Sequence, residues 1–140
     1  MKKYSLIISL LVVAFVVTIS SCKKNDDPVL NESVILIDSI VHPDTINFGE
    51  KLEINYYGVI GDGCDYFSRF EEIPLAEGEF ANTFKIKVWK YREDAANCSE
   101  QLKYLTDAQI GLTGMLAGDF LIKVVQPDGS ELTGEVFIKE

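Results

Sequence analysis

The sequence predicts an all-β fold, an antiparallel β-sandwich of about seven strands, with a small β-barrel as the alternative. In residues 33–140, apolar residues recur mainly at every second position, which is the spacing of strands that bury one face. Gly, Pro, Asn and Asp fall between the apolar runs, as turn residues do. About 108 residues suffice for one hydrophobic core, so we predict a single domain over this range.

The first two strands are predicted from this alternation. Ile35, Ile37 and Val41 lie in the first strand, with the polar Asp38 between them. The segment His42-Pro43-Asp44 ends it, because proline lacks the amide hydrogen that a strand ladder needs. The inward face of the next strand consists of Leu52, Ile54 and Tyr56.

The middle of the chain predicts two more strands. A turn at Gly61-Asp62-Gly63 precedes a strand through residues 66–75, which Glu77-Gly78-Glu79 ends. The clearest amphipathic strand covers residues 84–91. One face of that strand carries Phe84, Ile86 and Val88, and the other carries Lys85, Lys87, Trp89 and Tyr91.

The next part of the chain is less regular. Residues 92–101 are polar and predict a loop, with a short helical turn begun at Asp94 or Ser99 as the alternative. Residues 104–112 fit another strand.

The C-terminal segment predicts a β-hairpin. Residues 121–125 and 132–138 are strand-like, and Pro127-Asp128-Gly129-Ser130 turns the chain between them. Together with Leu116-Ala117-Gly118-Asp119-Phe120 before it, this hairpin resembles the last two strands of immunoglobulin-like and fibronectin-like sandwiches. The resemblance implies an immunoglobulin-like architecture, although Phe120 stands where a tyrosine is usual and the cysteine spacing differs from that of antibody domains.

The N-terminus predicts a signal peptide over residues 1–21. Positively charged Met1-Lys2-Lys3 precedes an apolar run over residues 4–19 that is shorter than a membrane-spanning helix. Ser20-Ser21-Cys22 resembles the lipobox of bacterial lipoproteins, which implies cleavage before Cys22 and acylation of its thiol. The alternative is an ordinary secretory signal followed by a cysteine without a role.

Residues 22–32 predict a flexible tether, because they are polar and contain a proline. Lys23–Pro28 resembles the export signal that follows the acylated cysteine in surface lipoproteins of the Bacteroidetes group. The whole pattern is similar to small lipoproteins of that group with one immunoglobulin-like domain. This resemblance implies an outer-membrane lipoprotein of the cell envelope, facing either the periplasm or the cell surface.

Charge and cysteine content restrict the partners. The formal charge is −9, and loss of Lys2 and Lys3 with the signal peptide would leave 11 basic residues against 22 acidic ones. Such a surface repels phosphate backbones, so we expect no nucleic acid partner. Cys64 and Cys98 remain as a pair in an oxidising compartment and predict a disulfide, because these two cysteines and the distant His42 make a poor metal site.

The sequence offers little catalytic chemistry. The single histidine, His42, precedes a proline at a strand end, and the familiar nucleophile, zinc and nucleotide motifs are missing. A glycosidase pair could use Glu71-Glu72 or Glu77 with Glu79, but adjacent strand residues point to opposite faces. Calcium at Asp62 and Asp65 would lack the regular ligand spacing of an EF-hand. We therefore expect no enzyme activity, no metal and no cofactor.

A ligand-binding face is predicted on the strand over residues 84–91. Alternation places Trp89 and Tyr91 on its outer side with Lys85 and Lys87, where aromatic rings could stack on sugars or anchor a protein. The competing interpretation puts Trp89 in the core through a one-residue slip in register. Tyr57 and Phe137 also fall on the outer faces of their strands.

The functional prediction is a lipid-anchored binding or accessory module without catalytic activity, whose partner is another envelope protein or a glycan. The alternative is a glycan-binding surface lipoprotein of a polysaccharide-capture system. A small envelope enzyme is a third hypothesis, and it would need a cleft with convergent carboxylates.

Overall fold

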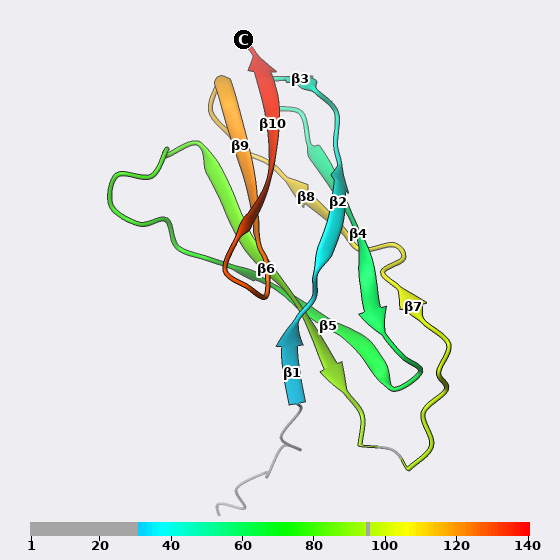
Figure 1. The fold of residues 1–140 in the computed structure, drawn as a ribbon. Helices are drawn as coiled ribbons and strands as arrows, with labels where there is room; N and C mark the ends of the chain where they lie inside the picture. The colour runs from blue at the N-terminus through cyan, green and yellow to red at the C-terminus, as the bar shows by residue number, and fades with distance from the viewer. Residues whose placement is uncertain (1–30, 95) are drawn as a thin grey trace, which may run out of the picture.

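The computed structural model describes residues 31–94 and 96–140, and these residues form ten strands in two sheets without a helix (Figure 1). The prediction of an all-β sandwich is confirmed. The sequence predicts about seven strands, and the structure has more because β1 (Asn31–Val34) and β3 (Thr45–Asn47) are additional and residues 104–112 form two strands. The predicted signal peptide, the predicted acylation site at Cys22 and the tether up to residue 30 lie outside the described residues.

The larger sheet has six strands, with β6 pairing three of the others. Its members are β1 (Asn31–Val34), β3 (Thr45–Asn47), β5 (Asp65–Glu72), β6 (Thr83–Arg92), β9 (Gly118–Val125) and β10 (Glu131–Lys139). The smaller sheet has four strands built around β4. Its members are β2 (Ile37–Val41), β4 (Leu52–Gly61), β7 (Lys103–Tyr104) and β8 (Gln109–Leu112).

The larger sheet is mixed, which corrects the prediction of a purely antiparallel arrangement. Strand β6 pairs with β9 in parallel, with Phe84 opposite Ile122, and β10 pairs with β3 in parallel. These pairs are not consecutive in the chain. Between β6 and β9 the chain crosses to the smaller sheet as β7 and β8, and such a crossover allows two strands to run in the same direction.

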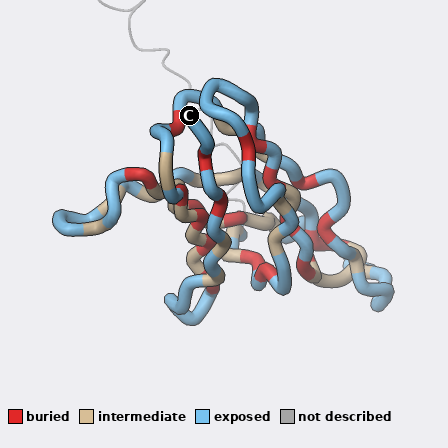
Figure 2. The backbone as a smooth tube through the Cα atoms, turned by 90° about the horizontal axis from the view of Figure 1, so that it is seen from above, coloured by how far each residue is buried: buried red, intermediate tan, exposed pale blue. Residues whose placement is uncertain are grey.

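The core lies between the two sheets and follows the predicted alternation. Leu52 and Ile54 of β4 face Ile86 and Val88 of β6 across a fully buried layer. Figure 2 shows buried positions alternating with exposed ones along the strands, while the long connections are mostly exposed. Burial of each such side chain contributes about 1.5 to 3 kcal/mol, so this layer provides the main stabilisation of the domain.

Several boundaries differ from the sequence predictions. Asn31 and Glu32 belong to β1 and not to the tether, because they pair with Arg92 and Tyr91 of β6. The strand predicted over residues 66–75 ends at residue 72, and the strand predicted over residues 104–112 is divided into β7 and β8. As predicted for a loop, the described residues between 93 and 102 form neither helix nor strand.

The C-terminal hairpin forms as predicted. Strands β9 and β10 pair from Gly118 opposite Ile138 to Val125 opposite Glu131. The amide of Gly129 donates to the carbonyl of Gln126 at 3.0 Å, and Gly129 has a φ of 85°. Only glycine adopts that angle without strain, which explains the Asp-Gly sequence in this turn.

Candidate functional site

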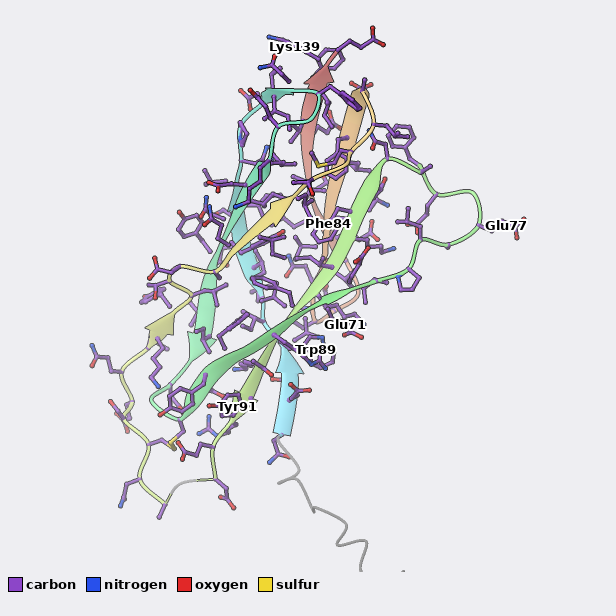
Figure 3. All side chains as sticks on the ribbon, turned by 180° about the vertical axis from the view of Figure 1, so that it is seen from behind. Glu71, Glu77, Phe84, Trp89, Tyr91 and Lys139 are labelled. Carbon is purple, nitrogen blue, oxygen red and sulfur yellow. A yellow bond between two sulfur atoms is a disulfide. The ribbon has the colours of Figure 1, made fainter. Side chains whose placement is uncertain are left out.

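The predicted ligand face on β6 is already occupied by contacts within the protein. Trp89 lies half-buried on the outer side of the larger sheet, so its assignment to the core is wrong. Its Nε1 donates to Oε2 of Glu71 at 2.5 Å, and the guanidinium of Arg69 lies 4.9 Å from the ring centroid. Lys87 stands opposite Glu71 in the register. Figure 3 shows Trp89 and Glu71 side by side.

The ring of Tyr91 is also in contact with another side chain of the protein. Its ring stacks on that of Tyr66, with centroids 5.5 Å apart and an interplanar angle of 20°. The ammonium group of Lys103 lies 3.6 Å from the centroid of the Tyr66 ring. The two aromatic side chains of the predicted face therefore stabilise the sheet, and they do not form a continuous platform for a ligand.

Lys85 takes part in an ion-pair network on the same face. Its ammonium group lies 3.0 Å from Glu79 and 2.7 Å from Glu131, and Lys123 bridges the same two carboxylates at 3.3 and 2.9 Å. The backbone amide of Ala76 and then Lys85 donate to Glu79 and lower the pKa of its carboxyl to about 2. Glu131 and Glu79 raise the pKa of Lys85. The two ammonium groups of this network therefore balance its two carboxylates.

The candidate glycosidase pairs are not assembled into a cleft. Glu71 bonds Trp89 on the outer face, and Glu79 belongs to the ion-pair network. Figure 3 shows Glu77 on the loop that projects from the sheet between β5 and β6, well away from Glu71. Glu72 follows Glu71 in β5 and lines a different part of the molecule. The acid and base of a hydrolase would need to converge on one substrate.

The predicted disulfide between Cys64 and Cys98 is confirmed, with the two Cα atoms 5.3 Å apart. Beside it, the guanidinium of Arg92 lies 2.8 Å from Asp62 and 2.9 Å from Asp65. Hydrogen bonding by Arg92 lowers the pKa of Asp62. Because both carboxylates are ion-paired and the two sulfur atoms are bonded to each other, this cluster has no ligand set to offer calcium or zinc.

His42 lies at the end of β2, as the sequence predicts. Its ring is half-buried and approaches Gly134 of β10, and Nδ1 lies 3.1 Å from the carbonyl oxygen of Pro43. The ring therefore fills a space at the edge of the sandwich. The surrounding contacts suit a structural role for this residue.

A pocket that the sequence did not predict lies on the smaller sheet, between β7 and β8. Both strands pair with β4, and residues 105–108 between them form no strand. This connection is held against β4 at both ends, because Tyr56 donates its amide to Ala108 and Leu105 donates its amide to Gly58, each at 2.9 Å. The resulting cavity of about 330 Å³ is lined by Asn55, Tyr56, Tyr57, Tyr104, Leu105, Thr106, Asp107 and Ala108.

This tyrosine pocket combines two exposed aromatic rings with polar groups. The side chains of Tyr57 and Tyr104 are 46% and 61% exposed. Asn55 offers an amide, Thr106 a hydroxyl and Asp107 a carboxylate at the same place. Asp107 has a φ of 58°, an angle that aspartate tolerates better than most residues and that often occurs at binding sites.

The sequence gives one partial signal for this pocket. Alternation along β4 places Tyr57 on the outer face, and the structure confirms that position. The sequence did not predict that Tyr104 lines the same pocket as Tyr57, because residues 104–112 fit a single strand. The interruption at residues 105–108 is set by contacts with β4, which are remote in the chain.

A second cavity, of about 360 Å³, opens at one end of the sandwich. Much of its wall consists of the side chains of the core, including Phe84, Met115 and Phe120. Asn82 closes one side, because its amide nitrogen donates to the carbonyl oxygens of Leu116 and Asp119 at 3.1 and 2.8 Å. This cavity forms where Asn82 holds the connection between β8 and β9 over the core.

Comparisons of the chain with protein-family models, curated proteins and solved structures give no match. Within the described part of the chain, no helix is long and apolar enough to span a bilayer.

Proposed function

We propose that the protein is a lipid-anchored binding module of the bacterial cell envelope, without catalytic activity, attached to the outer membrane. The observation that carries the binding function is the tyrosine pocket. It places two exposed rings and several hydrogen-bonding groups around one concave site. Asp107 is the single carboxylate among the residues that line it. One carboxylate suits recognition better than hydrolysis, which in most glycosidases uses two.

The envelope location is supported by two independent features. The first is the sequence of residues 1–22, with its positive start, its short apolar run and a cysteine after two small residues. Two or three acyl chains on Cys22 would hold the protein to a membrane, because one chain alone gives only reversible binding. The second is the disulfide between Cys64 and Cys98, a bond that persists in oxidising compartments.

The anchor is tested by expressing the full chain in a bacterium that processes lipoproteins. Mass spectrometry of the N-terminal peptide should find acylated Cys22 as the first residue, and Cys22→Ser should yield a protein without lipid. Protease treatment of intact cells then shows whether the domain faces outward. An N-terminal peptide that begins elsewhere, or that carries no acyl group, would contradict the proposal.

A further inference from the structure

We infer that the tyrosine pocket binds a neutral glycan, an inference that rests on the proposed function as a binding module. A sugar ring has an apolar face of C–H groups and a rim of hydroxyl groups. A site for it needs aromatic rings against the face and short polar side chains at the rim. The tyrosine pocket supplies both within one cavity of about 330 Å³.

The aromatic contribution comes from Tyr57 and Tyr104. Both residues are exposed, at 46% and 61%, so their rings can cover a ligand without first leaving the core. On the larger sheet, by contrast, Trp89 is covered by Arg69 and Tyr91 by Tyr66. No corresponding ring or cation contact involves Tyr57 or Tyr104 among residues 31–94 and 96–140.

The polar contribution comes from three short side chains at the pocket. Asn55 can donate and accept, Thr106 can do the same through its hydroxyl, and Asp107 accepts only. Sugar hydroxyls pair with all three kinds of group. A long apolar peptide side chain would leave these groups without partners, which costs binding free energy.

Charge selects a neutral sugar over an acidic one. The lining residues include one carboxylate, Asp107, and no lysine, arginine or histidine. Beside the pocket, Glu53 accepts a hydrogen bond from Gln109 at 3.1 Å and is ion-paired with Lys51 at 3.0 Å, so Asp107 is the carboxylate that sets the charge of the site. With a formal charge of −9 on the whole chain, uronate, sulfate and phosphate groups are repelled from the site.

The two aromatic rings of the pocket are held in position by strands. Tyr57 lies in β4 and is paired with Ser39 of β2, while Tyr104 lies in β7 opposite Val59 of β4. Thr106 and Asp107 lie in the connection between β7 and β8, which is hydrogen-bonded to β4 at Leu105 and Ala108. Because groups on strands keep their geometry better than groups on a loop, the rings need little ordering by a ligand.

The first test applies the full-length lipoprotein, purified in detergent micelles, to an array. The array carries neutral hexose and N-acetylhexosamine oligosaccharides beside hexuronate and sulfated oligosaccharides and apolar peptides. We expect binding to neutral oligosaccharides only. Selection of acidic glycans or peptides, or an array without bound oligosaccharide, overturns the inference.

The second test titrates the best-bound neutral oligosaccharide against variants by calorimetry. Tyr57→Ala and Tyr104→Ala should each weaken binding by about tenfold, and Tyr104→Phe, which keeps the ring, by less than about threefold. Phe48→Ala is the matched control, because it removes a ring that is 60% exposed elsewhere on the surface and should leave the affinity unchanged. Binding that survives both tyrosine-to-alanine changes overturns the inference.

The third test addresses charge selection through Asp107→Asn. Asparagine tolerates the same backbone angle and removes the negative charge, so the pocket should keep its shape. Binding of hexuronate oligosaccharides relative to neutral ones should rise several-fold, and an unchanged ratio overturns the assignment of charge selection to this residue. Mass spectrometry of the recovered glycan distinguishes failure of the sugar site from failure of the proposed non-catalytic function. Cleavage of the glycan would overturn the non-catalytic function while leaving the sugar site intact.

Discussion

The outer faces of the two sheets differ in what their aromatic and charged side chains contact. On the larger sheet, Trp89 meets Arg69 and Glu71, and Lys85 meets Glu79. On the smaller sheet, the rings of Tyr57 and Tyr104 stand in solvent beside a pocket. The contacts of Trp89 and Lys85 on the first face stabilise the fold, although Phe137 of β10 remains 49% exposed there. The second face keeps its rings accessible, which is what recognition of a ligand requires.

This difference shows that exposed aromatic residues in a strand are not equivalent. Trp89 and Tyr91 of β6 and Tyr57 of β4 all fall on the outer faces of their strands by alternation, so the sequence alone does not distinguish them. What separates them is whether a neighbouring strand brings a cation, a carboxylate or a second ring to the same point.

Removal of core methylene groups should destabilise the protein equally beneath both faces. Ile54→Ala lies under the smaller sheet and Ile86→Ala under the larger one, and both residues are fully buried. Each change should lower the free energy of unfolding by about 2 to 5 kcal/mol, from lost burial and the cavity left behind. Guanidinium denaturation of the full chain measures this. A much smaller cost for Ile54→Ala would mean that the smaller sheet is peripheral.

Loss of the disulfide should affect the smaller sheet more than the larger one. Cys64→Ser with Cys98→Ser removes a link between residues separated by 34 positions, which stabilises by about 3 to 4 kcal/mol in the chain-entropy model. The segment after Cys98 leads directly into β7 and Tyr104. Hydrogen exchange should therefore rise in β7 before it rises in β10, and uniform exchange would contradict this order.

Acid should weaken the ion-pair network of the larger sheet. Hydrogen bonds from Ala76 and Lys85 lower the pKa of folded Glu79 from 4.5 to about 2. A depressed folded pKa gives stabilisation that is fully present above about pH 4.5 and is lost as the pH falls towards 2. The difference in unfolding midpoint between wild type and Glu79→Gln should shrink over this interval. A constant difference would indicate that the carboxylate charge of Glu79 is not responsible for the stabilisation.

The smallest effects should distinguish the aromatic residues of the two faces. Arg69→Ala removes the cation over Trp89 and should cost about 0.5 to 1 kcal/mol of stability. Tyr104→Ala removes a ring that is mostly in solvent and should change stability by less than about 0.5 kcal/mol. Thermal unfolding of both variants measures the contrast. A larger cost for Tyr104→Ala would assign that ring a structural role.

Several features of the fold could be predicted because they depend on neighbouring residues. Alternation identified the inward faces of β4 and β6, and the Asp128-Gly129 pair identified the C-terminal turn. The remaining cysteine pair identified the disulfide between Cys64 and Cys98. The signal peptide and the acylation of Cys22 stay predictions, because they concern residues outside the described part of the chain.

The sequence could not indicate which outer-face aromatic residues are covered by other side chains. Alternation states which residues leave the core, but it contains no information about what then covers them. Arg69 reaches Trp89 because β5 pairs with β6 with a register shift between Phe67 and Arg69. The pocket forms where residues 105–108 interrupt the strand pairing while Leu105 and Ala108 stay hydrogen-bonded to β4.

The sequence by itself determined the all-β class, the inward faces of the strands and the cysteine pair, because each follows from the order of nearby residues or from composition. Only the tertiary structure decided the parallel pairs of the larger sheet, the division of residues 104–112 and which aromatic rings remain accessible. These features depend on strands that are far apart in the chain, and their pairing is set by the packing of the whole core.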